Sequence, residues 1–234
     1  MLSHKTQVIC VWSIPTFLVG YITAFVFISG FVPPPAPSLS ADEIANLFND
    51  NATRIRIGQL LCMVFAILYM PWAGVVTVQM ARIEGRLPVL AWLQLAGATM
   101  LTLLFMICSL LWLTTAFRPL QDPLNTQLLN DLSWLIFVMA YPEYWLQLIA
   151  MATVFLRDKS EQPFLPRWSC YFTFMVAVTG MGGSFAAFFK LGPWAWNGIF
   201  GFWVPIVSYL IWLIVMFVLL LKGLKRQSLD AEAA

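Results

Sequence analysis

Residues 131–157 read DLSWLIFVMAYPEYWLQLIAMATVFLR, and this stretch decides both the fold class and where a site should be sought. It is long and apolar enough to cross a bilayer as a helix, which takes about 20 apolar residues. Glu143 lies near its middle, whereas the other acids of the chain lie in loops or at segment ends. An ionisable group at bilayer depth is costly, so it usually faces the protein interior or a watery cavity and serves a function.

The composition of the whole chain agrees with a membrane protein. Of its 234 residues 61% are hydrophobic and only 10% are charged, against about 25% charged in soluble domains. Barrel strands would alternate in hydrophobicity over about ten residues, and these segments do not. We therefore expect an all-α polytopic membrane protein, a six-transmembrane-helix bundle in a single domain over residues 1–234. The predicted spans are residues 7–32, 57–80, 89–117, 132–156, 168–189 and 199–221.

The ends of the first span and the loops between spans predict the orientation. The first apolar run is too long for a signal-peptide core of roughly 7–15 residues, so we expect a true span. With the N-terminus inside, nine Lys and Arg residues fall on the inner side and four on the outer side. This excess predicts a multi-pass protein of the inner (plasma) membrane with both termini in the cytoplasm.

The outer loops contain two predicted short helices. Ser40 followed by Glu43 is a capping-box pattern, and the apolar residues after it fall on one face. Residues 41–50 should therefore form an amphipathic helix on the outer surface. Residues 121–130 are expected to form a second one.

The segments FVPPPAPSLSADE, IRIG, AFRP, LNDLSWLIF, FLRD, PRW and FFKLGPWAWNG together resemble an uncharacterised family of small bacterial membrane proteins. The resemblance covers nearly the whole chain. It implies the six-helix topology and a bacterial origin, and it carries no established activity and no residue roles.

Helical spacing around Glu143 predicts which way its side chain points. Small or polar residues recur three, four, seven and eight positions away on the same face. By contrast, Val138, Leu148 and Phe155 are expected to face lipid. Pro142 removes a backbone hydrogen bond one residue before the acid, and kinked helices of this kind tend to line cavities. The residues sharing the face with Glu143 are Ala140, Gln147, Ala150 and Met151.

Two interpretations of Glu143 stand side by side. In the first it is a protonated carboxyl that binds another helix and holds the bundle together, since apolar surroundings favour the neutral form. In the second it is a proton donor. Tyr141, Tyr144 and Trp145 flank it, and ring faces stabilise a cation that forms when an alkene is protonated. Trp and Tyr are also common at membrane interfaces, which is the ordinary explanation of such residues.

Two further stripes favour helix packing over ligand binding. The second span has small and polar residues on one face, from Gln59 to Thr77, with Tyr69 beside it and Pro71 as a possible kink. We consider this face a candidate partner of Glu143. In the fifth span, residues 179–184 read TGMGGS, and such small residues allow close backbone approach, within the bundle or between protomers.

Several classes of function are excluded. His4 is the only histidine, which is too few for bis-histidine haem, a non-haem iron triad or a copper site. The chain has no GxSxG, HExxH or Walker loop, and its four cysteines are not paired in sequence. A net charge of +2 without a basic patch gives no nucleic-acid footprint. We expect no metal, no cofactor and no nucleic-acid partner.

The predicted function is binding of a lipophilic small molecule, such as a terpenoid, sterol or acyl chain, in an intramembrane pocket around Glu143, with isomerisation or cyclisation as its extension. The alternatives are a proton-coupled transporter and a non-catalytic subunit of a larger membrane complex. Expected partners are membrane lipids, the lipophilic ligand, and a second copy or a partner membrane subunit. A subunit would expose its small-residue face, whereas an enzyme would close it inside. Glu143 is the candidate catalytic residue, and the candidate lining is Gln147, Tyr141, Tyr144, Trp145, Gln59 and Tyr69.

Overall fold

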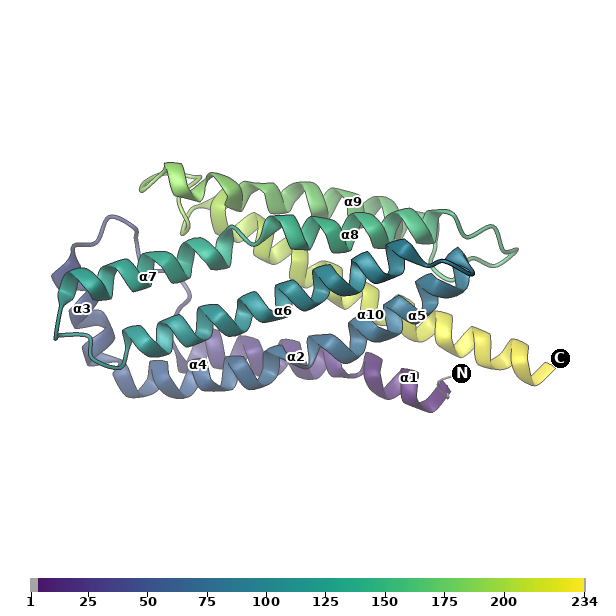
Figure 1. Ribbon diagram of the computed structural model, residues 1–234, viewed down its shortest axis with the longest axis horizontal. Helices are drawn as coiled ribbons and strands as arrows, with labels where there is room; N and C mark the ends of the chain where they lie inside the picture. The colour runs from purple at the N-terminus through teal and green to yellow at the C-terminus, as the bar shows by residue number, and fades with distance from the viewer. Residues whose placement is uncertain (1–3, 234) are drawn as a thin grey trace.

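The computed structural model describes residues 4–233, and this part of the chain contains six helical spans long and apolar enough to cross a membrane. The prediction of an all-α, multi-pass membrane protein is confirmed. Several spans are interrupted and therefore consist of two or three helices in series (Figure 1). The spans are His4–Ile28 (α1 His4–Val11, α2 Ser13–Ile22, π-helical η1 Thr23–Ile28), Ala52–Glu84 (α4 Ala52–Ala66, α5 Tyr69–Glu84), Val89–Thr115 (α6), Pro123–Leu156 (α7 Pro123–Val138, α8 Tyr141–Leu156), Arg167–Phe188 (α9 Arg167–Gly180, 3-10 helix η2 Met181–Phe188) and Ile199–Leu229 (π-helical η3 Ile199–Trp203, α10 Val204–Ala233).

Each span packs against the next one in the chain, and the sixth returns to the first. α2 contacts α4, α6 contacts both halves of the second and fourth spans, α8 contacts α9, and α10 contacts α9, α1 and α2. α5 also reaches α8 across the middle of this ring. The two termini lie at the same end of the bundle, opposite the short helix α3 (Figure 1). We call these the termini end and the α3 end.

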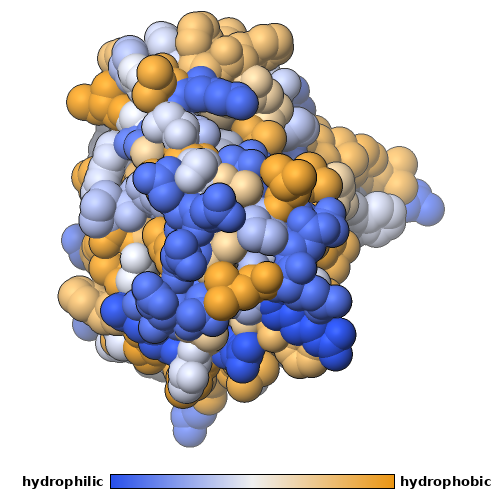
Figure 2. Space-filling view, turned by 90° about the vertical axis from the view of Figure 1, so that its left-hand side faces the viewer, coloured by the Kyte–Doolittle hydropathy of each residue, from blue (hydrophilic) through white to orange (hydrophobic). Residues whose placement is uncertain are grey.

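Aromatic side chains fill the interior of the bundle. Trp72, Trp112, Trp134, Trp212 and Tyr69 are all fully buried. Large apolar side chains on the outside of the spans are exposed instead, as expected where lipid is the solvent. Figure 2 looks onto the α3 end and shows hydrophilic residues gathered over the middle of that face, with hydrophobic residues around its margins.

The helix predicted over residues 41–50 is confirmed as α3, Ala41–Asp50. Its capping box is complete, because the Ser40 amide donates to Glu43 Oε2 over 2.8 Å and the Glu43 amide donates to Ser40 Oγ over 3.3 Å. Ile44 and Phe48 are buried, and α3 contacts α7 and α4. α3 therefore closes this end of the bundle as a lid.

Two arginines in the first turns of α4 connect α4 to the ends of two other spans at the α3 end of the bundle. Arg54 donates to the carbonyls of Phe27 and Ile28, where η1 ends. Arg56 donates to the carbonyls of Ala116 and Phe117, where α6 ends. Carbonyls at a helix C-terminus lack intrahelical partners and carry partial negative charge, so a cation there both satisfies and stabilises them.

Two predictions about the fourth span are wrong. Residues 121–130 are not a separate surface helix, because α7 begins at Pro123, after the Asp122 cap, and runs without a break into the span. The span is also not a single kinked helix, since it stops at Val138 and restarts at Tyr141. Pro142 occupies the first turn of the new helix, where its missing N–H costs nothing. The second span breaks in the same way at residues 67–68, ahead of Pro71.

Candidate functional site

Glu143 is buried in the first turn of α8, with 6% of its surface exposed. It packs on α6, since a side chain added at Gly97 would meet its backbone carbonyl at 2.7 Å. Its Oε1 atom is buried and has no hydrogen-bond partner within the described chain. The predicted inward direction of the side chain is confirmed.

Gln147 lies one turn further along α8 and is fully buried. Its Oε1 accepts a hydrogen bond of 3.0 Å from the Tyr69 hydroxyl at the start of α5. Its Nε2 has no partner among residues 4–233. The hydroxyl of Tyr209, from α10, is buried close to Tyr69 and makes no hydrogen bond of good geometry in the described structure. Three spans thus bring donors and acceptors with spare capacity to the middle of the bundle.

Tyr144 and Trp145 both bind the backbone of α9. The Tyr144 hydroxyl donates to the Val176 carbonyl over 2.9 Å, and Trp145 Nε1 donates to the Ala177 carbonyl over 2.7 Å. Both side chains therefore dock α8 on α9. Tyr144 also stands edge-on to Tyr209, with ring centroids 5.3 Å apart.

The glycines of the fifth span allow this packing. A side chain at Gly180 would meet the Tyr144 ring at 2.5 Å, and one at Gly183 would strike the Val138 carbonyl at the break in the fourth span. One at Gly182 would strike the Phe200 carbonyl of η3. The small-residue stripe predicted for this span is therefore closed inside the chain.

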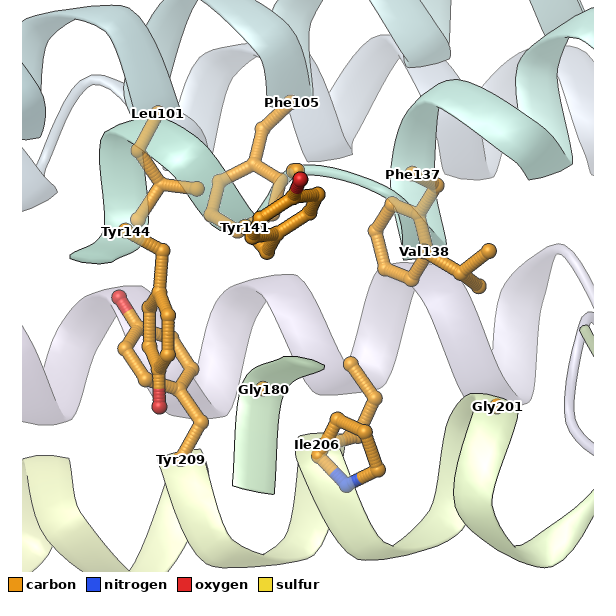
Figure 3. A pocket seen from close by; sticks show the side chains of 12 residues that line it. Leu101, Phe105, Phe137, Val138, Tyr141, Tyr144, Gly180, Gly201, Ile206 and Tyr209 are labelled. Atoms are coloured by element: carbon orange, nitrogen blue, oxygen red, sulfur yellow. The ribbon is translucent and has the colours of Figure 1, made fainter. Parts of the chain in front are cut away.

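A small cavity of about 60 Å³ lies at the break between α7 and α8 (Figure 3). Tyr144 and Tyr209 stand side by side at one end of it, and Phe137 and Val138 stand at the other (Figure 3). Tyr141 also lines it, as does Gly180. Glu143 itself does not line this cavity, although the residues on both sides of the Pro142–Glu143 pair do.

A larger apolar crevice of about 230 Å³ adjoins the small cavity. It lies between the second half of the first span and the start of the sixth, near the α3 end. Trp203 and Val207 at its rim are 39% and 46% exposed, so it opens on the lipid-facing surface. The residues that line both spaces are Phe105, Phe137, Ile206 and Tyr209.

The remaining expectations have mixed outcomes. Gln59 is buried but lies in α4, where its Nε2 donates to Ser29 Oγ over 3.0 Å, and it does not join Gln147 and Tyr69. Leu148 and Phe155 do not face lipid; both are buried, because α8 contacts α6, α9 and α5 and has little free surface. Val138 is half-buried.

Sequence reasoning missed Tyr209, Phe105 and Phe137 as lining residues. Tyr209 is the one tyrosine in the sequence of the sixth span, and its hydroxyl within an apolar run was the available signal. The two phenylalanines stand in apolar runs and carry no such signal, because which face of a lipid-embedded helix turns inward depends on its neighbours.

Residues 4–229, whose side chains are described, contain no group of three or more His, Cys, Asp and Glu side chains placed to hold a metal ion. Comparison of the chain with protein-family models, with curated proteins and with solved structures finds no match in any of the three.

Proposed function

We propose that this protein binds a lipophilic small molecule that enters from the membrane through the crevice between the first and sixth spans. The observation that carries the proposal is the pair of adjoining spaces, an apolar crevice that opens to lipid and a smaller cavity at a helix break. Ligand sites are typically apolar, with a few convergent polar groups.

The sizes of the two spaces favour a ligand that is only partly enclosed. Pockets that hold a whole drug-sized molecule measure roughly 300–1,000 Å³, whereas the crevice measures about 230 Å³ and the cavity about 60 Å³. An elongated or fused-ring lipid could place one end here and leave the rest among the acyl chains. Terpenoids, sterols and fatty acyl chains all meet this description.

The polar end of the ligand would lie near Tyr144 and Tyr209. The Tyr209 hydroxyl has unused hydrogen-bonding capacity, and the Gln147–Tyr69 pair lies behind it. A hydroxyl or carbonyl oxygen on the ligand would complete these bonds, which are worth most where water is excluded.

Glu143 extends the proposal from binding to chemistry. Glu143 is buried against Gly97 of α6 and does not line the small cavity itself, but its neighbours Tyr141 and Tyr144 do. A neutral Glu143 that protonates a ligand alkene would form a new C–H bond and leave a carbocation. Loss of a proton from a neighbouring carbon back to the carboxylate would restore both groups, giving an isomer or a ring without any co-reactant. The flanking rings would stabilise the cation.

Closure of the glycine stripe supports this proposal over a subunit role. Gly180, Gly182 and Gly183 face Tyr144, Phe200 and Val138 of the same chain, so this stripe is not available for a partner.

Photoaffinity labelling tests the binding site. Purified protein in lipid nanodiscs would be irradiated with diazirine derivatives of an isoprenoid alcohol, a sterol and a fatty acid, and labelled peptides would be mapped. We expect at least one probe to label the peptides containing Phe137 and Tyr209. Val207→Trp fills the rim of the crevice and should abolish this labelling, whereas Val218→Trp, 40% exposed on the same helix and outside the crevice, should not. Equal labelling of both variants would refute the site.

The catalytic extension has its own test. Glu143→Gln keeps the size of the side chain and removes its titratable proton, so any conversion of the labelling ligand should stop while photolabelling and melting temperature are unchanged. Full conversion by the Gln variant would exclude Glu143 as the proton donor and leave the binding site standing.

One observation favours a proton-coupled transporter as the second candidate. The second and fourth spans are both broken, and interrupted helices beside an ionisable group are common in carriers. Protein reconstituted in liposomes with a pH-sensitive dye inside would then acidify the lumen when a transported lipophile is added, and Glu143→Gln would abolish that signal.

A further inference from the structure

The termini end of the bundle contains a cationic cavity that the proposed function does not use. This cavity measures about 400 Å³ and lies between the end of α5, residues 157–164 and the last turns of α10. Four cations line it, Arg82, Arg157, Lys159 and Arg226, against one acid, Asp158. These cations stand where the second, fourth and sixth spans end, and Arg157 and Lys159 are exposed there.

The acid in this cavity is occupied by its own loop. Asp158 accepts hydrogen bonds from the Phe164 and Ser160 amides, over 2.7 and 3.0 Å. Partial burial acts to raise the pKa of Asp158, but these bonds, the Ser160 hydroxyl and the charge of Arg226 outweigh it and lower that pKa. Its carboxylate therefore stabilises the loop through these hydrogen bonds and does not pair with the exposed side chains of Arg157 and Lys159.

An apolar groove of about 300 Å³ continues from the cavity along α10. The Phe164 side chain lies against Gly223, where an added side chain would meet its ring at 2.7 Å. Pro163 adds apolar lining from the loop, and Leu219 extends it one turn further into the sixth span. Arg226 joins the two spaces, since it lines both and donates to the Pro163 and Phe164 carbonyls. Lys222 stands exposed beside the groove.

We infer that this site binds one anionic glycerophospholipid of the surrounding leaflet, with its phosphate in the cationic cavity and an acyl chain in the groove. Both parts of the site match the lipid. The cationic cavity suits the anionic headgroup, as basic pockets between spans do in other membrane proteins, and Leu219 and Phe164 form an apolar surface for the acyl chain. Neutral phosphatidylcholine would lack the net charge that the cavity selects. The site is independent of the crevice near the α3 end.

Lipid-dependent thermal stability tests the inference. The full-length protein in detergent would be titrated with phosphatidylglycerol or with phosphatidylcholine while its melting temperature is recorded. We expect saturable stabilisation by phosphatidylglycerol only. Each removed cation should weaken the affinity about fivefold, so Arg157→Gln combined with Lys159→Gln should weaken it about 25-fold. Neither Arg157 nor Lys159 makes a side-chain hydrogen bond within the described residues, so their replacement should not impair folding. The matched control is Arg118→Gln combined with Lys190→Gln, which removes two exposed cations at the α3 end.

A second pair of variants separates a lipid from a free anion. Leu219→Trp fills the groove and should weaken phosphatidylglycerol binding at least tenfold, while Val218→Trp, its neighbour outside the groove, should have no effect. Stabilisation by inorganic phosphate alone to the same extent as by the lipid, or an unchanged lipid affinity in Leu219→Trp, would overturn the lipid assignment. An equal loss in the α3-end control pair would overturn the site altogether.

Discussion

The contact between α6 and α8 can be tested by adding one carbon atom to Gly97. An alanine Cβ there would lie 2.7 Å from the Glu143 carbonyl oxygen and 3.0 Å from the Gln147 amide nitrogen. Both are backbone atoms of α8, so neither can rotate away, and the two helices must separate. Overpacking of this kind costs about 1–3 kcal/mol. The same change also gains up to about 1 kcal/mol, because alanine favours a helix more than glycine does.

Gly74 is the matched control, because it lies within a helix and an added Cβ meets no atom within 4 Å. Gly74→Ala should therefore show the helix gain alone, and Gly97→Ala the gain less the overpacking cost. The difference between the two variants isolates the helix contact. At about 2–4 °C per kcal/mol for a chain of this size, Gly97→Ala should melt about 2–12 °C below Gly74→Ala.

The measurement is thermal unfolding of both variants in one detergent, followed by tryptophan fluorescence and by loss of monodisperse protein on gel filtration. Gly97→Ala should also reduce photolabelling of the cavity, since Tyr144 moves with α8. Equal melting temperatures for Gly97→Ala and Gly74→Ala would refute the close approach of α6 and α8 and with it the placement of Glu143.

Three further predictions concern the α3 end. Phe48→Ala empties a fully buried aromatic site of the lid and should cost about 3–5 kcal/mol, measured as a lower melting temperature, whereas the exposed control Asn46→Ala should change it little. The Ser40 amide and hydroxyl hold the pKa of Glu43 below its usual value; the stability this adds is present above the ordinary pKa of about 4.3 and is lost as the pH falls through the lower folded value. Amide exchange in the first turn of α3 should therefore accelerate in acid. Glu43→Gln keeps a capping box but cannot titrate, so in this variant the acid-dependent acceleration should be absent. Asn46→Cys should react with a membrane-impermeant maleimide from outside the cell if both termini are cytoplasmic, and labelling only after the membrane is opened would reverse the orientation.

Sequence reasoning reached the elements whose signals are local. The Ser40–Glu43 capping box predicts the lid helix with its observed bounds, and apolar length alone predicts six spans. The inward direction of Glu143 followed from its small-residue face. The break at residues 139–140 was out of reach, because Pro142 is compatible with either a kink or a new first turn, and contacts with α9 and η2 decide between them. The crevice could not be predicted from the sequence either, because it results from how the first and sixth spans meet. The residues that face each other there are apolar, like those that face lipid.

The two arginines of α4 have a consequence for the order of assembly during synthesis. Arg54 and Arg56 are two positions apart, about 200° around the helix, so they reach opposite neighbours. The carbonyls bound by Arg54 precede it by 26 and 27 residues, and those bound by Arg56 follow it by 60 and 61. Arg54 can thus close the first hairpin as soon as the second span has left the ribosome. Arg56 has no carbonyl to bind until the third span is complete, so its charge remains at the membrane surface to receive the end of that span.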